Sequence, residues 1–209
     1  NNLGDDRLKG EKPSRGSVWS NRFIASAIFQ GAVITLLTAS FVGMQLLFSP
    51  SVNIIQILSL SFEGPAKWIF LGYIFYMILI VAIATTAIFY NHLEVNLQKR
   101  IRGVRSALAW ANLVGMNVGG AAVTLMMVYA GLAGSGVLGV IASSGASGLS
   151  ENPAIMGQFI TPIAAFAGLL IIGVVAGGLA YIATYFQSKP TDASHDNDNR
   201  SDMAKIGSV

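Results

Sequence analysis

The sequence contains no cysteine, and only 11% of its 209 residues are charged. Without cysteine the chain has no disulfide framework, no thiolate metal site and no cysteine nucleophile. The charged fraction is less than half of the ~25% that is usual in soluble domains. Hydrophobic residues make up 53% of the chain, and the mean hydropathy is +0.61. Lipid rather than water is therefore the expected solvent for most of the protein.

Charge is absent above all from the apolar cores of four long stretches, which run over about 22–47, 68–90, 107–132 and 159–186. Each stretch is near the ~20 residues that a helix needs to cross a ~30 Å hydrocarbon core. We expect an all-α integral membrane protein in which four transmembrane helices form a bundle over residues 22–186. The polar segments 1–21 and 187–209 are expected to be flexible tails, because they cannot bury enough apolar surface to become ordered.

Basic residues are distributed unevenly along this four-pass arrangement. The segments 48–67 and 133–158 together contain a single basic residue, Lys67. The other twelve of the thirteen lie on the side of the tails and of the loop 91–106, and they are Arg7, Lys9, Lys12, Arg15, Arg22, Lys99, Arg100, Arg102, Arg105, Lys189, Arg200 and Lys205. Basic residues of multi-pass proteins favour the cytoplasmic side. We therefore expect both termini in the cytoplasm and the chain in the plasma membrane.

Several classes of chemistry lack the residues they require. The apolar cores hold no Asp, Glu, Lys, Arg or His, the residue types that build intramembrane proton relays and ion pathways. No Ser-His-Asp set can be assembled at one depth, and no phosphate-binding GxxxxGK[ST] loop occurs. The basic residues lie at helix ends instead of forming a stripe with interleaved aromatics, which argues against a nucleic-acid partner. We expect no catalytic residue and no enzyme activity in this chain alone.

The segment Tyr90-Asn91-His92-Leu93-Glu94 is the one cluster with titratable chemistry. His92 is a candidate for binding a cofactor, either as a single metal or haem ligand or as a donor to a quinone carbonyl. Alternatively, the cluster is a helix C-terminus, where protonated His92 stabilises the helix dipole and Glu94 pairs with Lys99 or Arg100. Zinc and copper sites need three or four ligands, so we expect no metal or cofactor in the chain itself and only bound lipid.

Small residues predict where the helices pack. The third and fourth stretches carry glycines at helical spacing, including a G-x-x-x-G pattern, and the candidate packing residues are Gly115, Gly119, Gly168, Gly173 and Gly177. Glycines at this spacing let two helix backbones approach closely. The third and fourth helices are therefore expected to form the packed centre of the subunit.

Four amides are expected to bond between helices: Gln30, Gln45, Asn112 and Asn117. Such contacts contribute about 1 kcal/mol each. Asn112 and Asn117 are five residues apart, so they should not share a helix face closely. The alternative is that these amides line a cavity for a solute.

The two loops opposite the basic side are harder to interpret. Residues 51–62 are too short to span and fit either an amphipathic segment at the outer interface or a short loop. Residues 133–158 are rich in Gly and Ser and predict an irregular loop. The apolar run within it, residues 137–141, could dip into the interface or press against a neighbouring subunit.

The run Ala109–Asn117 loosely resembles helices of oxidase-type respiratory subunits, but the catalytic histidines of those proteins are absent and no residue role carries over. We expect a non-catalytic accessory subunit of a larger integral-membrane complex, respiratory or redox rather than transport, with other membrane subunits and lipids as partners. One alternative is a homo-oligomeric channel or facilitator for a small neutral solute, lined by the four amides. Another is a quinone-site or single-ligand redox subunit that uses His92.

Overall fold

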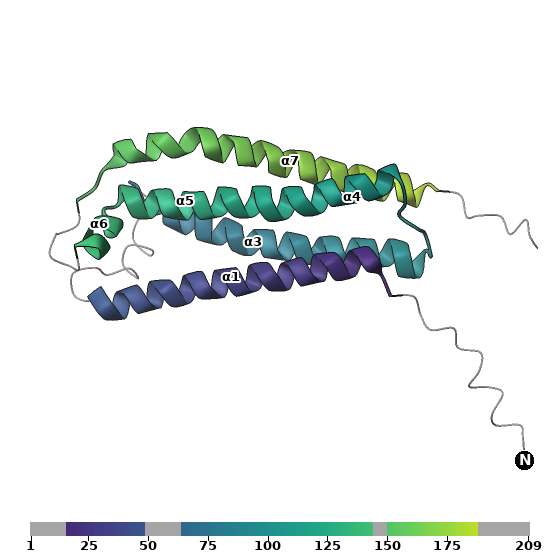
Figure 1. The fold of residues 1–209 in the computed structure, drawn as a ribbon, viewed down its shortest axis with the longest axis horizontal. Coiled ribbons are helices and arrows are strands. Elements are labelled where there is room, and N and C mark those ends of the chain that lie inside the picture. The colour runs from purple at the N-terminus through teal and green to yellow at the C-terminus, as the bar shows by residue number, and fades with distance from the viewer. Residues whose placement is uncertain (1–15, 49–63, 144–149, 188–209) are drawn as a thin grey trace, which may run out of the picture.

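The computed structural model describes residues 16–48, 64–143 and 150–187. Within these ranges all regular structure is helical, and four long helices run side by side along the molecule (Figure 1). Each is between 30 and 33 residues long and apolar enough to cross a membrane. The expectation of an all-α chain with four such helices is confirmed for the described residues.

The helices begin and end close to the apolar stretches of the sequence, but two of them are interrupted or extended by wider π-helical turns. The elements in chain order are α1 (Val18–Phe48), α3 (Ala66–Asn91), η1 (His92–Asn96), α4 (Val104–Val114), η2 (Gly115–Gly120), α5 (Ala121–Gly134), α6 (Val137–Ala142), η3 (Pro153–Met156) and α7 (Gly157–Tyr185). The segments η1 and η2 are π-helical and η3 is a 3-10 turn. α4, η2 and α5 follow one another without a break and form one long third helix.

This third helix lies at the centre of the bundle. α5 packs against α3 where Gly72 meets the Thr124 carbonyl, since a Cβ on Gly72 would lie 2.7 Å from that oxygen. α4 and η2 pack against α7 where Gly115 meets Gly173. α1 packs against α3 on the outer side. The third helix therefore lies between α3 and α7. Glycines at both contacts let the helix backbones approach closely.

Two apolar clusters fill the interior at opposite ends. One contains Trp19, Phe23, Tyr90, Leu93 and Leu113 among its buried residues. The other is formed by Phe41, Ile69, Val128, Leu132, Val137 and Val140. The apolar run of the 133–158 segment thus packs on the chain's own bundle through α6, because Val137 and Val140 are buried against the second cluster. The segment 51–62 lies outside the described residues.

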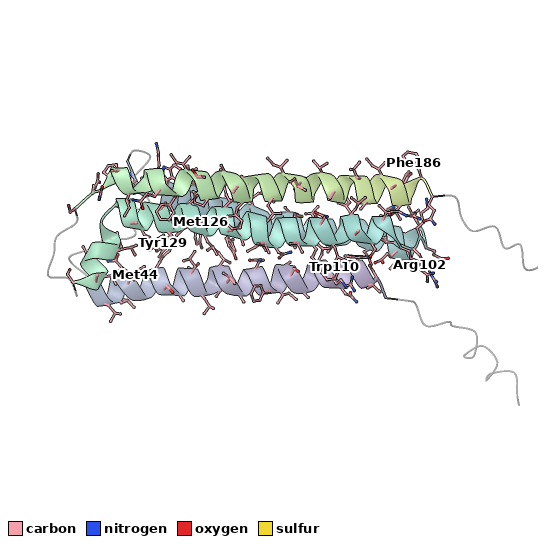
Figure 2. All side chains as sticks on the ribbon, turned by 45° about the horizontal axis from the view of Figure 1, so that its top comes forward. Met44, Arg102, Trp110, Met126, Tyr129 and Phe186 are labelled. Atoms are coloured by element: carbon pink, nitrogen blue, oxygen red, sulfur yellow. The ribbon has the colours of Figure 1, made fainter. Side chains whose placement is uncertain are left out.

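α1 begins and α7 ends at the same end of the bundle, together with the connection between α3 and α4. We call this the basic end, because the described residues there include Arg22, Lys99, Arg100, Arg102 and Arg105. Figure 2 shows Arg102, Trp110 and Phe186 at this end and Met44 and Tyr129 toward the other. Lys67 lies at the opposite end, at the start of α3.

Candidate functional site

Three polar side chains meet midway along the bundle and bond to one another. Tyr76 of α3 donates its hydroxyl proton to Gln30 Oε1 of α1. Gln30 Nε2 in turn donates to Asn117 Oδ1 of η2 at 3.1 Å. Gln30 and Tyr76 are buried, with only 4% and 1% of their surface exposed. The cluster therefore joins three helices through buried amide and hydroxyl groups, and we call it the Gln30 cluster.

The π-helical segment η2 gives the Gln30 cluster its form. A π turn changes the regular i to i−4 bonding of the backbone, and side chains can then reach its carbonyl groups. Asn117 Nδ2 donates to the Leu113 carbonyl at 2.8 Å, and Gln30 Nε2 also lies 3.4 Å from the Asn117 carbonyl. Both the oxygen and the nitrogen of the Asn117 side-chain amide are thus hydrogen-bonded inside the bundle.

Asn112 lies on a different side of the third helix. Its Nδ2 donates to the Tyr90 hydroxyl at 3.5 Å, a long and therefore weak hydrogen bond. Asn112 is 3% exposed and Tyr90 is 2% exposed. The ring of Tyr90 stacks on Phe23, with 5.1 Å between ring centroids. Asn112 and Asn117 thus point to different neighbours, as their five-residue spacing predicts.

Gln45 lies on α1 far from the other three amides. It is fifteen residues beyond Gln30, about 22 Å along the helix axis. Its side chain is half-buried. Of the four amides singled out in the sequence, the structure therefore brings only Gln30 and Asn117 together, and the set does not converge on one path through the described part of the chain.

Four of the five candidate packing glycines lie at close contacts. A Cβ on Gly115 would lie 2.6 Å from the Gly173 Cα, and one on Gly119 would lie 2.7 Å from the Leu170 nitrogen. A Cβ on Gly177 would collide with the Asn112 amide. Gly168 is different, because a Cβ there would meet nothing within 4 Å. It is five residues before Gly173, which turns it about 140° away from that contact face.

Glu94 closes the basic end of the bundle by capping α1. Its carboxylate accepts hydrogen bonds from the Ser17 hydroxyl and from the Trp19 backbone N–H, the latter at 2.9 Å. Ser17 Oγ also accepts the Ser20 backbone N–H at 3.1 Å, as an N-cap residue does. A carboxylate at a helix N-terminus is favoured by the helix dipole. This cap explains why α1 begins at Val18, four residues before the apolar stretch predicted from the sequence.

The suggested pairing of Glu94 with Lys99 or Arg100 is wrong for the described residues, because the Glu94 carboxylate bonds to Ser17 and Trp19 instead. The Lys99 ammonium instead donates to the Tyr185 carbonyl at the end of α7. Arg105 similarly donates to the Gln187 side chain. The connection between α3 and α4 therefore holds the last turn of α7, while Glu94 holds the first turn of α1.

His92 begins the η1 turn and is half-buried. Its Nδ1 lies 3.0 Å from Asn96 Nδ2, one turn further along the chain. Neither of the two hollows described below includes His92 in its lining. Within the part of the chain that the structure describes, no group of three His, Cys, Asp or Glu side chains is placed to hold a metal ion.

Arg22 lies between two indole rings at the basic end. Its guanidinium carbon is 4.6 Å from the centre of the Trp19 ring and 4.9 Å from that of Trp110. The two indoles meet edge to face with centroids 5.7 Å apart. These cation–π contacts tie α1 to α4 beside the Glu94 cap.

Two hollows remain on the sides of the third helix. The smaller, of about 450 Å³, lies beside α1 and is lined by Ala25, Ser26, Phe29, Gln30, Asn117 and Val118. The larger, of about 640 Å³, lies between α3 and α7, and Asn112 and Tyr90 are among its lining residues. Both volumes fall within the ~300–1,000 Å³ that is usual for ligand pockets. Sequence reasoning missed Tyr76, and it included Tyr90 in the titratable segment 90–94 without giving it a role, because tyrosines in an apolar stretch are ordinary residues until their partners are known.

The polar side chains that the structure describes at the helix contacts of the Gln30 cluster and of Asn112 are amides and hydroxyls, which form hydrogen bonds between helices. Comparison of the chain with protein-family models, with curated proteins and with solved structures found no match.

Proposed function

We propose that this chain is a non-catalytic subunit of a larger integral-membrane complex, and that it crosses the plasma membrane four times with its basic end in the cytoplasm. The described basic residues gather at one end of the bundle, whereas Lys67 alone lies at the other. This is the asymmetry that orients multi-pass proteins. A cytoplasmic basic end places both chain termini in the cytoplasm.

The observation that carries the assembly role is the outward face of α1. Ala25, Ala32 and Ala39 are exposed and spaced seven residues apart, and Gly43 follows on the same line. The opposite face of the helix carries buried Phe23, Gln30, Ile34 and Phe41. In a bilayer, small residues mark faces where another helix backbone approaches. A seven-residue repeat fits a helix that crosses at about +20°.

The smaller hollow lies next to this line of alanines. Ala25 belongs to both, and Phe29 is 64% exposed at its edge. A partner helix seated on Ala32 and Ala39 would place one of its large side chains in this hollow. The line and the hollow lie side by side on a helix surface whose exposed residues also include large apolar side chains such as Ile28, Leu36 and Val42.

The preference for a respiratory or redox complex over an ion-coupled transporter rests on exclusion. Ion-coupled transport needs titratable groups within the membrane. The polar groups at mid-height of this bundle are instead the neutral Gln30, Tyr76 and Asn117, bonded to one another. A bundle of this kind is suited to holding other subunits in place rather than to moving ions itself.

Substitution of Ala32 by Phe tests the assembly role. Ala32→Phe would separate α1 from a partner helix, whereas Ala84→Phe changes an equally exposed alanine on α3. Native electrophoresis of gently solubilised membranes should show the wild type and Ala84→Phe in a complex much larger than 22.0 kDa, and Ala32→Phe as released chain. A wild-type chain that migrates only as a free 22 kDa species or a small homo-oligomer would refute the proposal.

A further inference from the structure

The larger hollow is a groove between α3 and α7 with part of the third helix as its floor. Its walls include Phe89 of α3 and Gly178 and Tyr181 of α7, and its floor includes Asn112. Phe89 is 54% exposed and Gly178 is exposed, so the groove opens on the outside of the bundle. It extends along residues 82–90 of α3, which is about 12 Å of helix. It lies near the basic end, because α3 ends at Asn91.

The floor holds hydrogen-bonding capacity that the described residues do not use. Asn112 Nδ2 bonds to the Tyr90 hydroxyl, but Asn112 Oδ1 accepts from no described group, and the Tyr90 hydroxyl proton is donated to none. An amide oxygen and a phenol can each form a further bond. Both residues are more than nine-tenths buried. No enclosed side-chain nitrogen or oxygen among the described residues lacks a partner, so the unbonded Asn112 Oδ1 must be accessible, and Asn112 lines the groove. The pair therefore offers one donor and one acceptor, side by side, to a ligand in the groove.

These two groups are held in fixed positions. The Asn112 amide lies against Gly177, at a place where any larger residue would collide with it. Tyr90 is packed between Phe23 and Trp19, with ring centroids 5.1 Å and 6.1 Å away. A ligand would thus meet a preformed polar pair rather than side chains that must first be ordered.

The walls, in contrast, present apolar and aromatic surface. Thr85 and Thr86 line the groove, but their hydroxyls already donate to carbonyls of their own helix at 2.8 Å. The rings of Phe89 and Tyr181 meet edge to face with centroids 5.9 Å apart. The groove therefore combines aromatic walls with one polar contact at its floor.

We propose that this groove binds the ring of a lipid-soluble quinone. The Tyr90 hydroxyl donates to a ring carbonyl of the quinone, and Asn112 Oδ1 accepts from a hydroxyl of the reduced quinol. The ring lies against the aromatic walls and the glycines of α7, and the isoprenoid tail leaves through the open side into lipid. This ligand site goes beyond the assembly role, because it is contained in one chain.

Other membrane lipids match the groove less well. A phospholipid headgroup is charged and stays at the membrane surface, so an acyl chain would occupy the groove and leave the Asn112–Tyr90 pair without a polar partner. A polycyclic alcohol has a suitable hydroxyl, but its saturated fused rings are thicker than the planar ring of a quinone. Of these three lipid classes, the quinone matches both the polar floor and the aromatic walls.

Two glycines of α7 provide a matched test. A Cβ on Gly178 meets nothing within 4 Å and Gly178 lines the groove, so Gly178→Leu should fold and fill it. Gly168 is equally unobstructed on the same helix but does not line the groove. The purified full-length chain in nanodiscs of zwitterionic phospholipid is titrated with a short-tailed benzoquinone, and quenching of tryptophan fluorescence is followed. Trp19 is adjacent to Tyr90 and should report binding.

We expect saturable quenching in the wild type and in Gly168→Leu, and a Kd at least about tenfold higher in Gly178→Leu. Tyr90→Phe, which removes only the hydroxyl, should raise the Kd by about three- to tenfold. Equal binding by the wild type and Gly178→Leu, or no saturable binding, would overturn the proposal. Displacement of the quinone by an equimolar polycyclic alcohol would overturn the choice of ligand. If the wild-type chain binds no quinone but still migrates in a large native complex, this inference is refuted and the assembly role stands.

Discussion

Asn112 and Asn117 lie five residues apart on the same helix, but their side-chain amides differ in how many hydrogen bonds they form within the bundle. Asn117 is bonded at both ends, to Gln30 and to the Leu113 carbonyl. Asn112 is bonded at one end only, to Tyr90 across 3.5 Å, and its other end faces the groove between α3 and α7. The more deeply buried of the two is therefore the one with a hydrogen-bonding position unused.

This difference separates two roles for a buried amide. A fully bonded amide stabilises the contact of the helices that carry its partners, and removing a partner should lower stability. An amide with an open position and a weak internal bond contributes less to stability and more to binding. Substitutions in the Gln30 cluster should therefore lower the stability of the bundle, whereas substitutions in the Asn112–Tyr90 pair should mainly weaken ligand binding.

The packing of the third helix, which carries both amides, against α7 depends on Gly115. In Gly115→Leu the new side chain would meet the Gly173 backbone, which cannot move aside as a flexible side chain can. We expect a loss of about 3 kcal/mol or more in the free energy of unfolding, measured by helicity during denaturation in mixed micelles. Gly168→Leu should unfold like the wild type. A stable Gly115→Leu variant would show that α4, η2 and α7 do not pack as described.

Two tyrosines of α3 allow the sharpest comparison. Tyr76→Phe removes the proton donor to Gln30 Oε1 and should cost about 1.5 kcal/mol of stability. Tyr90→Phe removes only a long bond from Asn112, so its cost in the same denaturation assay should be less than half as large. Quinone binding should be weakened more by Tyr90→Phe than by Tyr76→Phe. Equal losses of stability in both variants would contradict the division between a structural and a binding amide.

How far the sequence could anticipate these features depends on the kind of signal each leaves. Four apolar stretches and the distribution of basic residues are patterns over many positions, and they predict the four long helices. Spacing alone also indicates that Gly115 and Gly119 lie on one face. Small size alone does not place a residue at the contact, since the five-residue offset of Gly168 from Gly173 turns Gly168 away from it.

The remaining features depend on which residues meet across the bundle. The π-helical segment η2 carries no residue pattern of its own, and it is what exposes backbone carbonyls to Gln30 and to the Asn117 side chain. The partner of Glu94 could not be chosen from sequence, because Lys99 is five residues away while Ser17 is 77 residues away. The groove arises from the packing of three helices, and no single stretch encodes it.

The Glu94 cap is the next contact in order of expected effect, and it lies at the same end as the Asn112–Tyr90 pair. Glu94→Gln keeps a hydrogen-bond acceptor but removes the negative charge at the α1 N-terminus. We expect a loss of about 1 kcal/mol in thermal or denaturant unfolding. The loss should shrink at high salt, since part of it is electrostatic. Full stability in Glu94→Gln would mean that the two hydrogen bonds alone hold α1.

Arg22 should have the smallest effect. Arg22→Gln removes the cation between Trp19 and Trp110 and should cost about 0.5 kcal/mol, whereas Arg22→Lys should retain part of the interaction. Arg102→Gln, at an exposed residue of the same end, is the matched control and should unfold like the wild type. If Arg102→Gln lowers the free energy of unfolding more than Arg22→Gln does, the contacts of Arg22 with the two indoles do not stabilise the bundle as described.

The proposed membrane topology underlies both the assembly role and the quinone site, and site-specific labelling tests it most directly. The chain has no native cysteine, so single cysteines at Gly16, Glu151 and Phe186 can be labelled without background. All three positions are exposed, and Glu151 lies at the end opposite the other two. With an impermeant thiol reagent, Glu151→Cys should react in intact cells, whereas Gly16→Cys and Phe186→Cys should react only after the cytoplasmic face is opened. Labelling of Glu151→Cys and Phe186→Cys from the same side would show that α7 does not cross the membrane and would contradict the account.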